Sequence, residues 1–268
     1  MAVRIIWSFW RGPMDAITRR CVESWARHAR GWTVRVLDER SLGRYRIRRP
    51  AAFAALTPAQ QSDVVRLSLL SRYGGLWMDA SVLLSAPLDW LPALDGDAYF
   101  GFALYPNYVE SWLLYCPRPG NPHIGRWLAA LNELIDTRPR QRHPAYRAAA
   151  ACLPHIVPGA LREAREYFLV YLAYHHCVET EAAFRAEFAR MPARTERALA
   201  AMPGARLFYD GFRPLRCFPY VTKFTKHGRN AYRWLRPEML ALYTALAVAV
   251  AVAVWRARRR WLRSDRAA

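Results

Sequence analysis

The residues best suited to chemistry lie within positions 61–81 of this 268-residue chain. Asp63 and Arg66 are three positions apart, so on a helix they share one face and present a carboxylate beside a guanidinium. Asp79 follows the apolar run 76–78, and open α/β sheets bind ligands at the carboxyl ends of such strands. A carboxylate there can hold a divalent cation that bridges a diphosphate, or accept a hydrogen bond from a ribose hydroxyl.

A helix and the strand after it must position these side chains. Thr57 is typical of a helix N-cap, Pro58 suits the first helical position, and Gln60 can close a capping box. The helix is expected to run to about Tyr73, where Gly74-Gly75 ends it. Taken singly, these features have structural explanations, because an Asp–Arg pair on a helix is commonly a surface ion pair and Gly-Gly is commonly a helix end.

The remaining pattern predicts an α/β domain over residues 1–236, with a mostly parallel central sheet flanked by helices. A strand within Val3–Trp10, a helix within Asp15–Ala29 and a strand at Trp32–Leu37 form a β-α-β opening. Further strands are expected at Tyr99–Leu104 and Trp112–Tyr115, and further helices at Gly125–Ile135, Glu163–Val178 and between Glu181 and Ala201.

The segment 237–268 differs in composition and forms a separate C-terminal region. Residues 239–255 carry no charge and are flanked by arginines on both sides. As a helix they would span about 25 Å, slightly less than a bilayer core of about 30 Å. We expect a hydrophobic helix embedded in, or lying on, a membrane. A helix buried against this protein or a partner is the alternative, and the flanking charges do not settle an orientation.

Composition narrows the class of protein. The net charge of +19 attracts anions, which could be nucleic acid, an anionic membrane leaflet or phosphorylated small molecules. The 13% aromatic content argues against disorder, collagen and coiled coil. No P-loop, G-x-G-x-x-G, G-x-S-x-G or H-E-x-x-H motif occurs, which counts against NTPases, dinucleotide enzymes, serine hydrolases and zinc proteases. The five scattered cysteines predict reduced thiols, and the first ten residues do not fit a signal peptide, so a cytoplasmic location is expected.

The order of the motifs resembles the DXD-containing glycosyltransferase superfamily (initiating mannosyltransferase-like). S-D-x-x-R, a helix, Y-G-G, a hydrophobic strand and D-x-[DS] follow one another, and Asp79-Ala80-Ser81 looks most like the capsular polysaccharide synthesis proteins. The segments 5–12, 110–113 and 220–226 resemble further family motifs in the expected order. The resemblance covers roughly residues 3–227 and implies a nucleotide-binding fold of the GT-A type.

The resemblance also implies roles for individual residues. Asp63 would accept hydrogen bonds from hydroxyls of the donor sugar, Arg66 would hold the sugar or its phosphate, and Asp79 would bind ribose or a metal ion. These three are the expected catalytic residues. The expected substrate-binding residues are Trp10, which would flank the base, with Tyr73, Gly74, Gly75, Trp112, Lys223, Lys226 and His227.

A divalent cation, Mn²⁺ or Mg²⁺, is the implied cofactor, with Asp79 and Ser81 as its ligands. Ser81 departs from the family pattern, because many relatives carry a second Asp there. A hydroxyl is a poorer ligand for a hard cation than a carboxylate, which puts metal dependence in doubt. Lys223, Lys226 or His227 could supply the missing positive charge to a departing diphosphate.

We therefore expect a hexosyltransferase-type glycosyltransferase that moves a sugar from a nucleotide-diphosphate donor to a capsular or other surface polysaccharide, with retention of configuration. Its acceptor would be a glycan or lipid-linked glycan, and the C-terminal segment would hold it at the cytoplasmic face of the inner membrane. One alternative is a catalytically degenerate scaffold that binds nucleotide sugar. Another is a basic nucleic-acid-binding protein, which explains the charge but not the order of the motifs, so nucleic acid is not an expected partner.

Two further motifs invite a metal-site interpretation. Asp95-Gly96-Asp97 is literally D-x-D, but its context favours a turn. His175 and His176 are adjacent on a predicted helix, so they point to different faces and packing is the expected role.

Overall fold

A computed structural model describes residues 2–84, 86–103, 108–148, 166–191, 215–217 and 221–224. The predicted boundary at residue 236 and the hydrophobic segment 239–255 lie outside these ranges. Within them, none of the helices combines the length and apolar character needed to cross a bilayer. The chain divides into two units, the first of Met1–Gly12, Trp32–Asp79 and Pro92–Thr195, the second of Pro13–Gly31, Ala80–Leu91 and Glu196–Ala268.

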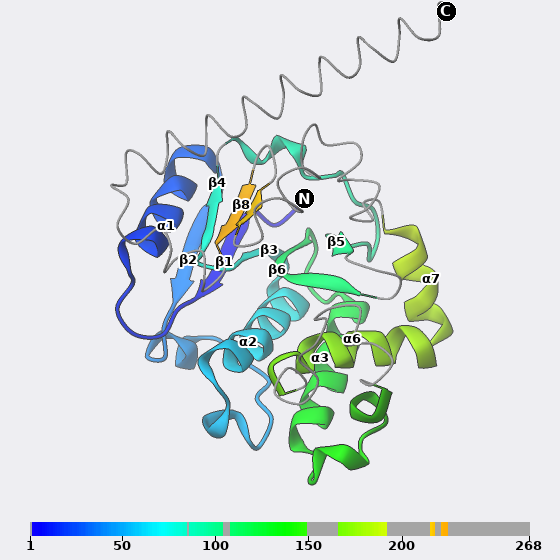
Figure 1. Ribbon diagram of the computed structural model, residues 1–268. Helices are drawn as coiled ribbons and strands as arrows, with labels where there is room; N and C mark the ends of the chain where they lie inside the picture. The colour runs from blue at the N-terminus through cyan, green and yellow to red at the C-terminus, as the bar shows by residue number, and fades with distance from the viewer. Residues whose placement is uncertain are drawn as a thin grey trace, which may run out of the picture. The chain divides into compact units, whose positions relative to one another are not determined.

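The first unit is built on a five-stranded sheet with the strand order β2-β1-β3-β6-β5 (Figure 1). Its strands are β1 (Ile5–Phe9), β2 (Thr33–Leu37), β3 (Gly75–Met78), β5 (Phe100–Ala103) and β6 (Val109–Cys116). β1 pairs in parallel with β2 and β3, whereas β6 runs antiparallel to both β3 and β5. The sheet is therefore mixed and not mostly parallel as expected. One reason is that too few residues separate β5 from β6 for the crossover that a parallel pair requires.

Helices of the first unit share the core on the face of the sheet to which Trp7 and Phe9 of β1 contribute side chains. They are α2 (Pro58–Tyr73), α3 (Pro122–Asp136), α6 (Leu169–Thr180) and α7 (Ala182–Arg190). α2 and α6 contact the sheet, and α3 and α7 pack against these helices. Trp77, Trp127 and Tyr174 fill the layer between helices and sheet and are almost completely buried. The predicted helices and strands of this region are confirmed within the described residues. The start of the predicted helix Glu163–Val178, before residue 166, and the part of the last predicted helix beyond residue 191 lie outside them.

The helix that carries Asp63 and Arg66 begins and ends where the sequence predicts. The Thr57 side chain accepts from the backbone of Gln60, the Gln60 side chain accepts from the Thr57 backbone, and Pro58 is the first helical residue. Gly74 ends the helix with a φ of 66°, a conformation that favours glycine. Because β3 begins at the next residue, no loop separates α2 from β3, and these two elements together position Asp63, Arg66 and Asp79.

The second unit contains α1 (Ala16–His28) and a three-stranded antiparallel sheet of β4 (Val82–Leu84), β8 (Val221–Phe224) and β7 (Leu215–Cys217). The Trp25 indole donates to the Val82 carbonyl at 2.7 Å and the Leu84 N–H donates to the Ser24 hydroxyl at 2.9 Å, so α1 is held against β4.

Short 3₁₀ turns lie at Ser41–Arg44, Phe53–Ala55 and Arg140–Arg142 in the first unit and at Leu88–Trp90 in the second.

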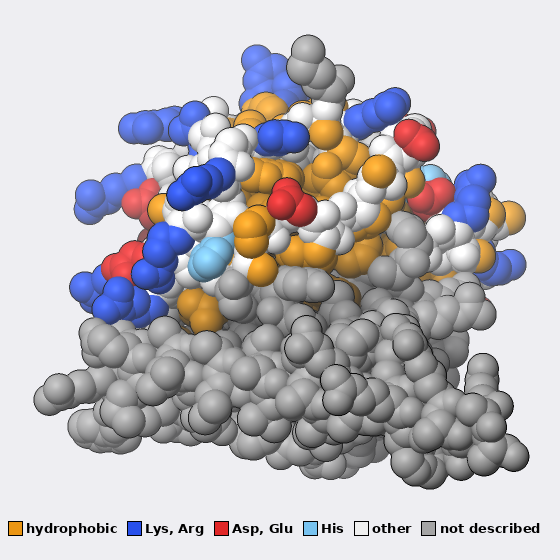
Figure 2. Space-filling model, turned by 90° about the horizontal axis from the view of Figure 1, so that it is seen from above, with side chains coloured by type: hydrophobic (Ala, Val, Ile, Leu, Met, Phe, Trp, Pro, Cys, Tyr) orange, Lys and Arg blue, Asp and Glu red, His pale blue; other side chains and the backbone are white. Residues whose placement is uncertain are grey.

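The excess of basic residues in the composition is visible on the surface, and three of the five cysteines lie in the interior. On the described part of the face shown in Figure 2, the blue side chains, which are arginines, outnumber the red Asp and Glu side chains. Cys21, Cys116 and Cys177 are buried and form no disulfide in the described part of the chain, and their reduced state stays a prediction. Burial raises the pKa of Cys116 to about 12, so this thiol is unreactive at neutral pH.

Candidate functional site

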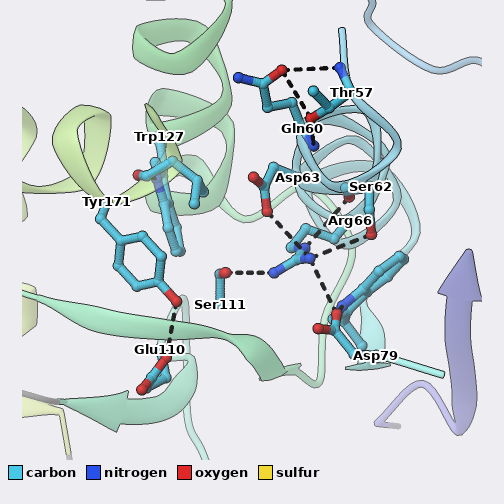
Figure 3. Close-up of polar contacts among 12 residues, drawn as sticks. Thr57, Gln60, Ser62, Asp63, Arg66, Asp79, Glu110, Ser111, Trp127 and Tyr171 are labelled. Atoms are coloured by element: carbon cyan, nitrogen blue, oxygen red, sulfur yellow. Dashed lines mark hydrogen bonds and ion pairs between the residues drawn. The ribbon is translucent and has the colours of Figure 1, made fainter. Parts of the chain in front are cut away.

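Asp63, Arg66 and Asp79 meet at a single point in the first unit (Figure 3). Nη2 of Arg66 lies 3.2 Å from Oδ1 of Asp63 and 3.1 Å from Oδ1 of Asp79. The side chains of Arg66 and Asp63 are 5% and 10% exposed, whereas that of Asp79 is 22% exposed. The cluster is thus rooted in the core, and Asp79 is its most accessible member.

The local structure explains why these side chains converge. Asp63 and Arg66 share one face of α2, and Asp79 comes directly after the last residue of β3. The Asp79 N–H donates to the Trp112 carbonyl at 2.9 Å, which continues the β3–β6 pairing past the end of the strand. The Trp77 indole donates to Oδ1 of Asp79 at 2.9 Å, and the Arg66 guanidinium lies 5.1 Å from the centre of the Trp77 ring. Two independent donors therefore fix one oxygen of the Asp79 carboxylate.

The Arg66 guanidinium directs its donors at protein atoms. Besides the two carboxylates, it contacts the Ser62 hydroxyl at 3.3 Å, the Ser62 carbonyl at 3.4 Å and the Ser111 hydroxyl. The resemblance implied direct contact between Arg66 and the sugar or its phosphate. In this structure Arg66 holds Asp63 and Asp79, and its contact with a sugar or phosphate stays a prediction.

The guanidinium of Arg66 is charged within this cluster. Burial alone would lower the pKa of Arg66, but the charges of Asp79 and Asp63 outweigh it and raise that pKa, so the guanidinium stays protonated. Asp79 is the most exposed of the three side chains, so its carboxylate is the one that a ligand reaches most easily.

Sequence reasoning missed Ser111 and Tyr171 as members of the network. Ser111 on β6 accepts from Arg66, and the Tyr171 hydroxyl of α6 donates to Oε2 of Glu110 at 2.9 Å. Burial raises the pKa of the Tyr171 phenol, so it stays neutral and able to donate. These contacts join residues 45 and 61 positions apart, which no local pattern reveals. A usable signal was present, however, because Glu110 and Ser111 are consecutive polar residues in a fully buried strand.

Tyr73, Gly74 and Gly75 lie at the opposite end of β3 from Asp79. The Gly74 carbonyl accepts a hydrogen bond of 2.8 Å from the Trp7 indole. Gly75 has a φ of 100°, and a Cβ there would lie 2.5 Å from the Ile5 carbonyl oxygen. The structure therefore does not bring these three residues to the cluster, and close backbone packing accounts for the glycines.

The other predicted substrate-binding residues are spread over different surroundings. Trp10 follows β1 and is partly exposed, and its backbone N–H donates to the Leu37 carbonyl at 2.9 Å. Trp112 is 3% exposed and stacks on Phe102 with ring centres 5.2 Å apart. Lys223 lies in β8, but its side chain is outside the described structure, as are Lys226 and His227. Substrate binding by these residues stays a prediction.

The predicted metal ligands are oxygen donors. Asp79 belongs to the first unit, and Ser81, which is 2% exposed, belongs to the second. Among the described residues, no three His, Cys, Asp or Glu side chains are grouped so that they could hold a metal ion. This donor set fits Mg²⁺ or Mn²⁺ better than Zn²⁺, since Mg²⁺ is commonly held by one or two carboxylates together with substrate phosphates.

The two competing motifs have the structural roles expected of them. Asp95-Gly96-Asp97 forms a turn in which the Ala98 N–H donates to the Asp95 carbonyl at 3.1 Å. His175 stacks on Tyr108 and His176 packs against His143, so the adjacent histidines point to different neighbours. Both predictions are confirmed.

Comparison with known proteins gives a family match, and this match includes the residues of the cluster. Residues 1–124 match the model of the capsular polysaccharide synthesis protein family. Among curated relatives, glycosyltransferase afumC of Aspergillus fumigatus is 33% identical in an alignment of 207 positions that covers 66% of this chain and 53% of that protein. O-glycosyltransferase braB of Annulohypoxylon truncatum is 27% identical in an alignment of 204 positions that covers 63% of this chain and 48% of that protein. The chain thus spans about half the length of these relatives.

Two solved structures are also similar. The PaToxG glycosyltransferase aligns with a TM-score of 0.41 at 14% identity, covering 70% of this chain and 84% of that one. A glycosyltransferase involved in glycosylation of the major capsid of PBCV-1 aligns with a TM-score of 0.34 at 12% identity, covering 58% of this chain and 78% of that one.

Proposed function

We propose that this protein is a glycosyltransferase, because residues 1–124 match the model of the capsular polysaccharide synthesis protein family and the chain is similar to curated glycosyltransferases, as the order of its motifs predicted. The donor is a nucleotide-diphosphate sugar and the acceptor a growing surface glycan. The observation that carries this proposal is the convergence of Asp63, Arg66 and Asp79 at the carboxyl end of β3.

Asp79 is the residue that meets the donor. Its carboxylate, with the Ser81 hydroxyl, would hold a divalent cation, and such a cation neutralises charge that develops on a departing diphosphate. The cluster favours this arrangement because it exposes Asp79 more than Asp63 and Arg66. Asp63 is the residue that would accept hydrogen bonds from sugar hydroxyls.

Arg66 acts through the two carboxylates. Its guanidinium holds Asp63 and Asp79 on either side, while Ser62 and Ser111 hold the guanidinium. Charged groups fixed before the donor arrives need little reorganisation as the reaction proceeds, which is how preorganised sites lower barriers. Arg66 is therefore a positioning residue in this proposal.

The acceptor and the stereochemistry follow from the family resemblance alone. We include in the proposal a lipid-linked glycan acceptor, retention of anomeric configuration, and attachment through residues 237–268 to the cytoplasmic face of the inner membrane. Deleting residues 237–268 should then abolish sedimentation with vesicles of phosphatidylcholine alone, which carry no net charge, while donor binding persists.

Thermal stabilisation by a panel of nucleotide-diphosphate sugars, with and without Mn²⁺, tests the proposal. A donor that binds the folded protein raises its melting temperature by mass action. The added stability is about 2.7 kcal/mol when the donor concentration is 100 times the dissociation constant. Asp79→Asn should abolish the Mn²⁺-dependent part of the shift. Asp97→Asn, in the turn that also reads D-x-D, is the matched control and should keep it. If no donor stabilises the wild type, or if both variants respond alike, the proposal is wrong.

Ser81 gives a specific reason to consider a second function. A buried hydroxyl stands where many relatives carry an acid, so the site could bind nucleotide sugar without turning it over. Such a scaffold would show donor-dependent stabilisation but no donor hydrolysis or transfer above that of Asp79→Asn. Turnover that is lost in Asp79→Asn excludes it.

A further inference from the structure

A row of exposed arginines lies on the segment that leads from β2 into α2. Arg44, Arg46, Arg48 and Arg49 are exposed, whereas Tyr45 and Ile47 between them pack against the core. With Arg138, which follows α3 and is also exposed, these arginines form what we call the basic strip. The alternation of burial directs apolar side chains inward and guanidinium groups outward along the same stretch of chain.

The segment is fastened to the outer side of two helices. The Arg48 N–H donates to the Ser68 hydroxyl of α2 at 3.2 Å, and the Arg48 carbonyl accepts from Asn132 of α3 at 3.1 Å. Both carboxylate oxygens of Asp136, at the end of α3, accept from the N–H groups of residues 51 and 52 at 2.9 and 3.0 Å. These bonds hold the arginines of the segment close to the end of α3, where Arg138 follows.

The strip is strongly positive. Within the described residues, none of its five arginines forms an ion pair, and the nearby carboxylate of Asp136 accepts backbone N–H groups. Glu133 is the other acid at this end of α3, and it lies 3.8 Å from His143. Five cations beside two acids therefore leave an excess of positive charge on an exposed surface, and guanidinium groups bind phosphate oxygens well.

We propose that the basic strip is a docking surface for the anionic leaflet of a phospholipid bilayer. A row of guanidinium groups on an outward-facing segment can reach phosphate groups that lie in one plane. Single-stranded nucleic acid fits this surface less well, because such ligands stack their bases on exposed aromatic rings. Among the described residues, Tyr167 is the exposed large hydrophobic side chain, and it is not part of the strip.

This inference does not rest on the proposed function, since the strip contains none of the residues of the cluster. It also differs from attachment through residues 237–268. Binding to vesicles can be measured without any sugar donor, so failure of either proposal is recognised separately.

Co-sedimentation of the full chain with phosphatidylcholine vesicles, with and without phosphatidylglycerol, tests the proposal. The strip variant is Arg46→Gln/Arg48→Gln/Arg49→Gln. The matched control is Arg4→Gln/Arg27→Gln/Arg118→Gln, which removes the same charge from exposed arginines elsewhere. Each basic residue close to an anionic leaflet strengthens binding about fivefold, so the strip variant should bind phosphatidylglycerol vesicles on the order of 100-fold more weakly. The control variant should bind nearly as well as the wild type, and salt should weaken wild-type binding.

Three results would overturn the proposal. Equal losses in both variants would mean that net charge, not this surface, controls binding. Unchanged binding in both would leave the strip without a role at membranes. If the strip variant loses affinity for heparin but keeps its affinity for anionic vesicles, the surface binds a soluble polyanion. The melting temperatures of both variants, measured beforehand, show whether they are folded.

Discussion

Two groups of polar side chains are buried in the first unit, and they differ in charge. Around Arg66, two carboxylates and one guanidinium meet at the end of β3, and Asp79 is partly exposed. Between β5 and α6, the hydroxyls of Tyr99 and Tyr174 lie 2.8 Å apart, with both residues about 1% exposed or less. Burial raises the pKa of both phenols, so this second pair is neutral.

The difference separates a site from a structural contact. A neutral pair that shares a hydrogen bond costs little to bury and has no charge to attract a ligand. A cluster of charged side chains is costly to bury, and this one keeps Asp79 partly exposed, which is the property expected of a ligand site. The same fold thus contains both arrangements. Removing the charge of Asp79 should lower activity with little change in stability, whereas substitutions in the tyrosine pair should lower stability with little change in activity.

The largest expected effect is on activity at the charged cluster. In Asp79→Asn the remaining oxygen can still accept from Trp77 and Arg66, so the fold should persist while the charge is lost. We expect donor hydrolysis or transfer to fall on the order of 100- to 1,000-fold, as for loss of one electrostatic contact in other enzymes. The melting temperature should change little. Activity equal to that of Asp97→Asn would remove the functional distinction between the two buried groups.

The next effect is on stability at the same cluster. Arg66→Met keeps much of the side-chain volume but leaves Asp63 and Asp79 facing each other without a cation. Removing one partner of a buried ion pair costs about 3 kcal/mol or more, because a buried charge is left uncompensated. Urea denaturation should show this loss. Asp63→Asn in the Arg66→Met background should recover part of it, and a lack of recovery would show that charge repulsion is not the cause.

Sequence patterns predict the parts of this cluster that depend on residues close together in the chain, and not the contacts between residues far apart in the chain. Thr57, Pro58 and Gln60 specify where α2 begins, and Gly74 specifies where it ends, so local chemistry fixes the helix face of Asp63 and Arg66. Asp79 could be placed because a strand of fixed length follows. In contrast, the contact of Arg66 with Ser111 depends on β6 pairing antiparallel with β3, which no local pattern specified.

The position of the basic strip also depends on contacts that the sequence does not show. The alternation of arginine with Tyr45 and Ile47 is visible in the sequence, but it is as typical of a short strand as of a charged loop. Its position depends on Asp136 and Asn132, which lie more than 80 positions away and cap the segment's backbone. Long-range hydrogen bonds to loop backbone are the part of this fold that sequence patterns do not reveal.

A smaller effect is expected at the neutral pair. Tyr174→Phe removes one hydroxyl and leaves the Tyr99 hydroxyl buried without its partner, which costs about 1 to 2 kcal/mol of stability. Tyr99→Phe/Tyr174→Phe removes both polar groups, so it should be no less stable than the single variant. Donor turnover should match the wild type in both, in contrast to Asp79→Asn. A loss of turnover with normal stability would place the tyrosine pair in the functional site.

The smallest effect concerns pH and extends the comparison to a neutral group that can become charged. His143 is 4% exposed and its Nδ1 accepts from the Ala145 N–H at 3.1 Å. Burial lowers its pKa, with His176 and Arg147 acting in the same direction and Glu133 against them. As pH falls below about 6.5, the unfolded chain therefore binds a proton that the folded chain resists, and stability decreases.

His143→Asn keeps an acceptor for the Ala145 N–H and removes the titration. The variant should lose less stability than the wild type between pH 7.5 and pH 5, by about 1 kcal/mol at most for one histidine. Urea denaturation across this range measures both slopes. Parallel curves would mean that His143 is accessible enough to be protonated in the folded chain, and that acid sensitivity comes from other groups. A shallower curve for His143→Asn would show that the neutral interior, unlike the cluster at Asp79, is maintained by excluding charge and not by balancing it.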